Sequence, residues 1–91
     1  MNTQLTELKN IGNTSAHWLK TIGIANRQQL QELGSVAAYL RIQQRGIKVS
    51  KVLLYTLEGA LLDIHWNDIP EKTKLRLLKE VEEQIQLAHE T

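Results

Sequence analysis

Apolar residues recur at three- and four-residue spacing along most of the chain, which is the spacing of one face of an α-helix. Five glycines and the stretch "WNDIP" interrupt this pattern and divide the chain into five or six segments. No segment shows the sustained alternation, rich in β-branched residues, that is typical of a half-buried strand. The pattern therefore predicts an all-α protein, a compact bundle of five to six helices.

The first four predicted helices are short and cover about residues 3–9, 13–22, 26–33 and 35–45. Asn26 and Gln29 have the spacing of a capping box at the start of the third helix, and Gly46 is placed to end the fourth. The residues expected to face inward are Leu5, Leu8, Trp18, Leu19, Ile22, Leu30, Leu33, Val36, Tyr39, Leu40 and Ile42. Ala38, Arg41 and Arg45 are expected on another face of the fourth helix.

The fifth predicted helix runs from an N-cap at Ser50 to Trp66 and is apolar over most of its circumference. Its expected apolar positions are Val52, Leu53, Leu54, Leu57, Ala60, Leu61, Leu62 and Ile64. A narrow polar strip follows Lys51, Tyr55 and Glu58. Such a helix is central or lies at an interface, and we expect Trp66 at its end to fill the core.

The last predicted helix covers about residues 69–88 and is amphipathic. Asp68 and Glu71 have capping-box spacing, with Pro70 in the first turn. Its expected apolar stripe is Leu77, Leu78, Val81, Ile85 and Ala88, and Lys72, Arg76, Lys79 and Glu83 are expected to face solvent.

Two segments resemble each other when one gap is allowed, "IGNTSAHWL" and "LGSVAAYL". The match pairs Gly12 with Gly34, Ala16 with Ala37, Trp18 with Tyr39, and Leu19 with Leu40. Two helix-hairpin-helix-like units would produce it, and so would chance similarity between helices rich in alanine and leucine.

A glycine in such a hairpin allows the backbone to approach a phosphate, which the free N–H groups of the next helix then bind. The candidate phosphate contacts in the first copy are Lys9, Asn10, Gly12, Asn13 and Lys20. The alternative is that Gly12 only turns the chain so that the helices pack. Lys9 and Asn10 stand where the strongest DNA-binding hairpins carry Pro-Gly.

The chain has 91 residues, enough for one domain, which we expect to span residues 1–91. Its net charge of +1 is unevenly distributed, since residues 1–57 hold seven basic and two acidic residues and residues 58–91 hold four and eight. Arg41, Arg45, Lys48 and Lys51 lie in a stretch without any acid. They are further candidate DNA contacts, or they form an ordinary solvated helix surface.

Several classes of function are disfavoured by residue content. The absence of cysteine excludes disulfides, thiolate catalysis and cysteine-based metal sites. The three histidines lie in separate segments without metal-ligand spacing, and no serine lies in a nucleophile elbow. A site built from Glu58, Asp63 and His65 is the enzymatic alternative. We expect a cytoplasmic protein without enzymatic activity, cofactor, metal, small-molecule substrate or membrane segment.

Several short motifs occur together in this sequence. They are Asn10-Ile11-Gly12, Ser15-Ala16, Gly34, Ala37-Ala38-Tyr39, Leu54-Tyr55, Leu57-Glu58-Gly59-Ala60 and His65-Trp66-Asn67-Asp68. In this combination, over about residues 4–85, the chain resembles the C-terminal domain of the TfoX/Sxy family of bacterial competence regulators, here as a stand-alone domain.

The resemblance implies a helical, helix-hairpin-helix-like module without known catalytic activity. Complete members of the family carry an additional N-terminal α/β domain and promote expression of DNA-uptake genes together with the cAMP receptor protein. We therefore expect a protein partner, either a transcription regulator or a second copy of the chain, with direct DNA contact as the alternative. Trp18, Tyr39, Tyr55 and Trp66 are the candidate interface or core aromatics.

Overall fold

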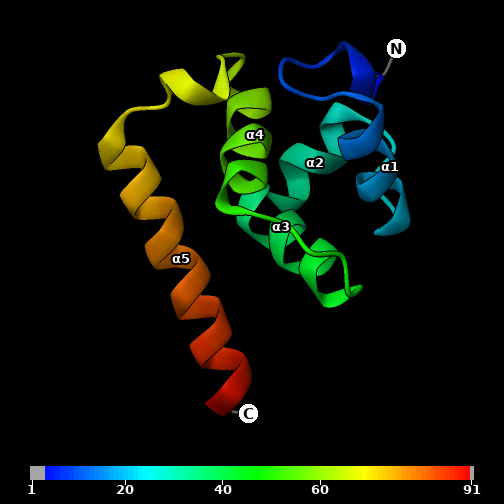
Figure 1. Ribbon diagram of the computed structural model, residues 1–91. Coiled ribbons are helices and arrows are strands. Elements are labelled where there is room, and N and C mark those ends of the chain that lie inside the picture. The colour runs from blue at the N-terminus through cyan, green and yellow to red at the C-terminus, as the bar shows by residue number, and fades with distance from the viewer. Residues whose placement is uncertain (1–3, 91) are drawn as a thin grey trace.

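The computed structural model describes the backbone of residues 4–90, which form five α-helices and two single-turn 3-10 helices without any strand (Figure 1). The elements are η1 (Leu5–Glu7), α1 (Asn13–Thr21), α2 (Arg27–Leu33), α3 (Ser35–Gln44), α4 (Lys51–Leu62), η2 (Trp66–Asp68) and α5 (Glu71–Glu90). The predicted all-α class is confirmed. None of the described helices is long and apolar enough to cross a membrane.

The predicted helix caps at Asn26 and Ser50 are confirmed. The Asn26 side chain accepts a hydrogen bond from the Gln29 N–H at 2.9 Å, and the Gln29 side chain accepts one from the Ala25 N–H at 2.6 Å. The Ser50 hydroxyl accepts a bond from the Val52 N–H at 3.3 Å. The Asn26 and Ser50 side chains thus satisfy backbone donors that the first turns of α2 and α4 leave unpaired, whereas Gln29 holds the residue before the Asn26 cap.

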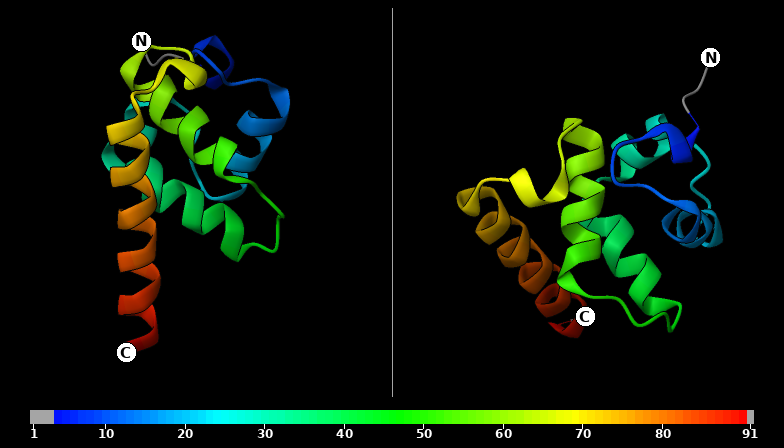
Figure 2. Two further views of the ribbon diagram at one scale, coloured as in Figure 1. Left: turned by 60° about the vertical axis from the view of Figure 1, so that its left-hand side comes forward. Right: turned by 45° about the horizontal axis from the view of Figure 1, so that its top comes forward.

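The core lies along α3 and α4, with α1 and α2 on one side and α5 on the other (Figures 1 and 2). The largest side chains that are completely buried are Leu19, Leu30, Ile42, Leu54, Leu57 and Leu77. Because α3 contacts α1, α2, α4 and α5, it is covered on more than one face. Ala38, which was expected on a different face from the apolar stripe of this helix, is therefore also fully buried.

The first and fifth predicted helices differ from the observed elements. The first is only the 3-10 turn η1, and its expected first residue, Thr3, lies outside the described residues. The fifth, α4, ends at Leu62 because Asp63 adopts a left-handed conformation with φ of 59°. The chain then turns back, and the Ile64 N–H donates to the Gly59 carbonyl at 2.9 Å.

One correction follows from this early end of α4. Trp66 lies in η2, where it is half-buried and stacks on His65 with ring centroids 5.7 Å apart, so it does not fill the core. The apolar residues Val52 and Leu62 lie in the first and last turns of α4 and are 41% and 50% exposed.

The last helix begins later than predicted and leaves the bundle before it ends. It starts at Glu71, and Asp68 belongs to η2 instead of capping α5. Leu77, Leu78 and Val81 pack against the core, as expected. The stripe continues into a part of α5 that extends past the other helices (Figure 1), so Ile85 is 41% exposed.

Candidate functional site

The two glycines of the predicted repeat each precede a helix, but only one makes a tight turn. Gly34, with φ of 90°, joins α2 directly to α3. Gly12 precedes α1 in an extended conformation, with φ of −95°. The left-handed residue of the first copy is Asn10, with φ of 73°. The predicted turn at Gly12 is therefore wrong, and a 3-10 turn replaces the helix expected before it.

Asn10 uses its side-chain amide to hold the segment after α4. Its Nδ2 donates to the carbonyl of Ile64 at 2.9 Å, and to that of Thr56 at 3.5 Å. Its Oδ1 accepts a bond from the Trp66 N–H at 3.2 Å. Asn10 was a candidate phosphate contact, but its side-chain amide is directed into the protein. Its preference for left-handed conformations was the sequence signal for this turn.

Gly59 makes room for this contact in the middle of α4. A Cβ atom at Gly59 would lie 2.5 Å from Asn10 Nδ2 and 2.7 Å from the Ile64 carbonyl oxygen. Glycine inside a helix costs about 1 kcal/mol relative to alanine, so its presence there needs a packing reason. Asn10, Gly59 and the segment 64–66 form one structural unit, which joins the start of the chain to the end of α4.

The remaining candidate DNA contacts do not form one surface. Arg41 lines a groove between α3 and α5, whereas Lys48 lies beside Ser15 and Trp18 of α1. The candidates Lys9, Gly12, Asn13, Lys20, Arg45 and Lys51 are also exposed. None of the six basic candidates forms an ion pair or hydrogen bond with another described residue through its side chain.

The four candidate aromatic residues have different environments. Tyr39 is buried in the core, and Trp18 and Tyr55 are half-buried against it. The ammonium of Lys74 lies 5.3 Å from the centre of the Tyr55 ring, which gives a cation–π contact between α5 and α4. Tyr39 and Tyr55 therefore serve packing, whereas Trp66 is half-buried and stacks on the exposed His65 ring.

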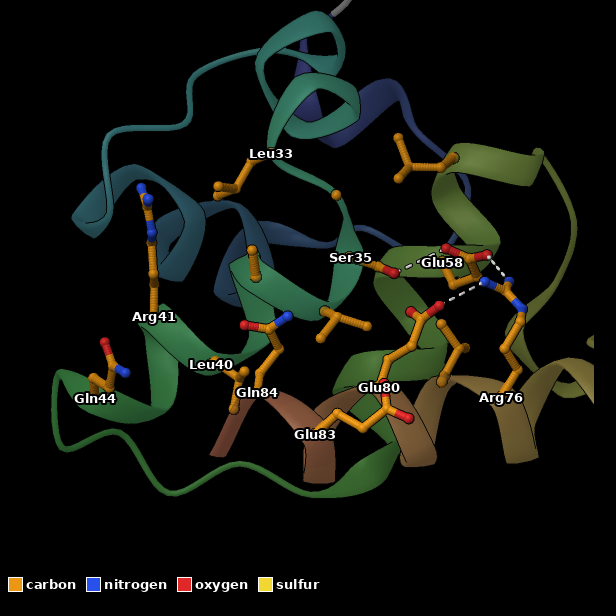
Figure 3. Close-up of a pocket in the computed structure, with 15 residues that line it drawn as sticks. Leu33, Ser35, Leu40, Arg41, Gln44, Glu58, Arg76, Glu80, Glu83 and Gln84 are labelled. Carbon is orange, nitrogen blue, oxygen red and sulfur yellow. Dashed lines mark hydrogen bonds and ion pairs between the residues drawn. The ribbon is translucent and has the colours of Figure 1, made fainter. Parts of the chain in front are cut away.

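A groove with a volume of about 730 Å³ lies between α3 and α5 (Figure 3). Its apolar lining consists of Leu33, Val36, Ala37, Leu40, Leu61 and Leu77. Its polar lining includes Arg41 and Gln44 from α3 and Glu80, Glu83 and Gln84 from α5. We refer to this feature as the α3–α5 groove. It could not be found from the sequence, because its walls are separated by about 40 residues.

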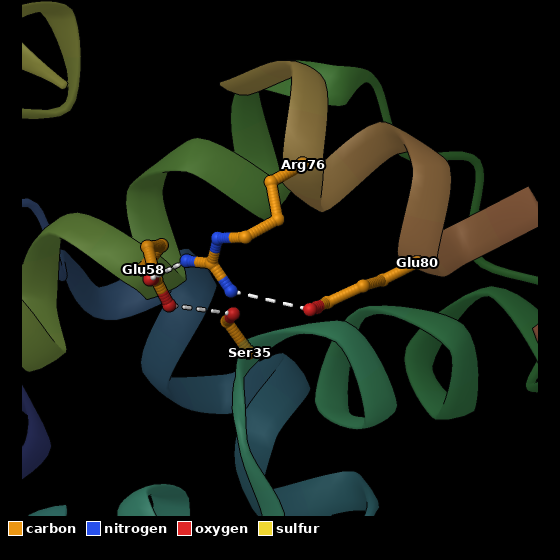
Figure 4. A network of polar contacts seen from close by, with 4 residues as sticks. All are labelled: Ser35, Glu58, Arg76 and Glu80. Atoms are coloured by element: carbon orange, nitrogen blue, oxygen red, sulfur yellow. Dashed lines mark hydrogen bonds and ion pairs between the residues drawn. The ribbon is translucent and has the colours of Figure 1, made fainter. Parts of the chain in front are cut away.

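A chain of polar contacts closes one end of the α3–α5 groove (Figure 4). The Ser35 hydroxyl donates to Glu58 Oε1 at 2.8 Å, and Arg76 pairs with Glu58 Oε2 at 3.3 Å. Arg76 also pairs with Glu80 at 3.2 Å. Because these residues come from α3, α4 and α5, the contacts fix the position of α5 beside the bundle. Arg41 and Gln44 lie at the other end of the groove (Figure 3).

The described residues offer little for metal chemistry. No three histidine, aspartate or glutamate side chains among them come together in a metal-binding arrangement. The enzymatic alternative required Glu58, Asp63 and His65 to form one site. Asp63 and His65 are exposed at the end of α4, whereas the Glu58 side chain contacts Ser35 and Arg76. The groove therefore offers an apolar surface with charged edges, which is suited to binding.

Comparison with known proteins gives consistent matches over most of the chain. The family model for the TfoX C-terminal domain matches residues 1–81. Protein Sxy of Escherichia coli strain K12 is 35% identical over 66 residues, which are 69% of this chain and 32% of that protein. The chain thus spans about a third of the length of this curated relative.

Two solved structures from Listeria monocytogenes share the fold. An uncharacterised protein in a triclinic crystal form gives a TM-score of 0.82 at 35% identity, covering 90% of this chain and 93% of that chain. A protein of unknown function in a tetragonal form gives 0.78 at 36% identity, covering 88% and 98%.

Proposed function

The chain belongs to the TfoX C-terminal domain family and is related to the competence regulators, and on this premise we propose that it is a non-enzymatic regulatory domain that binds a protein partner. The observation that carries the proposal is the α3–α5 groove. Grooves with an apolar lining and charged edges are a common means of binding an amphipathic helix.

The charges along the groove specify the kind of partner. Glu80 and Glu83 lie on the α5 side, and Arg41 lies on the α3 side. Glu80 is already paired with Arg76, so Glu83 is the acid left to meet a new cation. The expected partner is a helical segment with an apolar row, a basic residue facing α5 and an acidic residue facing α3.

Filling the groove should prevent this binding. Ala37 lines the groove and is half-buried on α3, so Ala37→Arg places a long charged side chain where the partner's apolar row would lie. We expect capture of the partner from nuclease-treated lysate to fall at least about tenfold, which corresponds to 1.4 kcal/mol. Affinity capture with quantitative mass spectrometry, followed by titration of the purified partner, measures the effect.

The control is Leu75→Glu, which changes an exposed residue outside the groove and should leave capture unchanged. Circular dichroism of both variants establishes that they fold. Partner capture that is equal for wild type and Ala37→Arg contradicts binding in the groove. Loss of capture on nuclease treatment instead indicates that nucleic acid connects the proteins.

A second function, direct DNA contact, is favoured by the six exposed basic residues whose side chains have no ion-pair or hydrogen-bond partner among the described residues. We expect binding of duplex DNA to weaken with salt, with a slope of about −0.9 for each phosphate contact. Arg45→Ala combined with Lys48→Ala should reduce that slope by about 2. Fluorescence anisotropy at several salt concentrations measures it.

The matched control combines Lys72→Ala with Lys79→Ala, which removes the same charge from α5. Equal losses of affinity in the two double variants would show a nonspecific effect of net charge. No binding at low salt by the wild-type chain would exclude direct contact.

A further inference from the structure

One face of α5 has the residue spacing of a coiled-coil seam. Glu71, Leu75, Leu78, Glu82, Ile85 and His89 alternate at steps of four and three residues, which is the spacing of contact positions between paired helices. Leu75 is 59% exposed and Ile85 41% exposed, and Leu78 is half-buried at the edge of the core. We name this face the α5 seam. The α3–α5 groove is lined by other residues of α5.

The charges of α5 are separated along its length. Its first nine residues include Lys72, Lys74, Arg76 and Lys79 with one acid, whereas residues 80–90 hold four glutamates and no lysine or arginine. A parallel pair of such helices would place like charges side by side. An antiparallel pair would place the basic half of each helix beside the acidic half of the other, which is favourable.

We propose that two copies of this chain associate through the α5 seam as an antiparallel pair of α5 helices. In the register that fits best, Leu75 of one copy lies opposite Ile85 of the other. The same register places Leu78 opposite Glu82 and Glu71 opposite His89. Each half of the pair then contains one apolar layer, Leu75 with Ile85, one layer in which Leu78 faces Glu82, and an end at which Glu71 faces His89.

Glu82 is the one acidic residue in the middle of the α5 seam, and it keeps this association weak. Its carboxylate meets Leu78 of the second copy and can gain a partner only by turning toward the nearby Lys79 of that copy. The desolvation of Glu82 opposes association. The resulting dimer is reversible and depends on concentration. The dimer proposal does not depend on the proposed partner site, because the α3–α5 groove is not covered in the dimer.

Analytical ultracentrifugation of the full chain over micromolar to millimolar concentrations tests the dimer. Glu82→Leu should tighten association by about tenfold or more, because it completes the apolar seam. Leu75→Glu should abolish it. Leu87→Glu is the matched control, since Leu87 is 54% exposed on the other side of α5, and it should leave association unchanged. If the wild-type chain and Glu82→Leu both stay monomeric at every concentration, the proposal is overturned.

The orientation can be tested by crosslinking, because the chain has no cysteine of its own. Leu75→Cys and Ile85→Cys are prepared separately, mixed and oxidised. An antiparallel pair gives a disulfide between the two different variants, and each variant alone gives little. A parallel pair joins each variant to itself, which overturns the proposal, as does the absence of crosslinking in the mixture. Ala37→Arg should dimerise normally, so the dimer and the partner site can fail independently.

Discussion

Replacing Gly59 with alanine is expected to destabilise the domain by about 3 kcal/mol, although alanine is the better helix former. The added methyl group would lie 2.5 Å from Asn10 Nδ2 and 2.7 Å from the Ile64 carbonyl oxygen. The carbonyl cannot easily retreat, because the Ile64 N–H is bonded to the Gly59 carbonyl and its own oxygen accepts from Asn10. Urea denaturation followed by circular dichroism measures the change in the free energy of unfolding.

The control for this substitution is Gly12→Ser. A Cβ atom at Gly12 meets nothing within 4 Å, and the extended backbone there accepts any residue. Since serine is a slightly better N-cap for α1 than glycine, this variant should be neutral or more stable by a few tenths of a kcal/mol. A Gly59→Ala protein as stable as the wild type would contradict the close packing at Gly59. Strong destabilisation by Gly12→Ser would instead indicate that residue 12 forms the turn that the sequence predicted.

Local sequence signals were sufficient for much of the fold. The spacing of apolar residues located α1 to α5, and the side chains of Asn26 and Ser50 marked the starts of α2 and α4. These features depend on neighbours within four residues, so they can be read from a short window. The end of α4 could not be predicted from such a window. The segment that turns back after α4 is held by Asn10, which lies 54 residues from Ile64 in the sequence.

The candidate site was less predictable for the same reason. Arg41 and Lys48 are close in sequence and suggested one basic surface, yet one lines the α3–α5 groove and the other lies beside α1. Helical periodicity also gave α5 a complete apolar stripe, but it could not show that the bundle ends near Val81. The exposed end of α5 and the groove are products of tertiary arrangement.

The substitution Asn10→Ala is expected to destabilise the domain by about 3 to 4 kcal/mol. It leaves the Trp66 N–H and the Ile64 carbonyl without their partner, and each such loss costs about 1 to 3 kcal/mol where the group is buried. It also places alanine at a φ of 73°, which adds about 1 kcal/mol. Asn10→Gly removes this backbone strain, so it should be about 1 kcal/mol more stable than Asn10→Ala in urea denaturation. Equal stability of the two variants would contradict the left-handed turn at this residue.

The variant Asn10→Asp separates the donor role of the amide from its acceptor role. A carboxylate still accepts from the Trp66 N–H, but it places an unprotonated oxygen against the Ile64 carbonyl. Only the protonated carboxyl can donate there, so folding raises its pKa above the value in the unfolded chain. The stability gained from that proton is therefore complete at acid pH and lost as the pH rises through the folded-state pKa. In parallel denaturation curves, the loss of unfolding free energy in Asn10→Asp relative to wild type should grow from acid to neutral pH. A loss that does not depend on pH would show that the hydrogen bond from Asn10 Nδ2 to the Ile64 carbonyl contributes little.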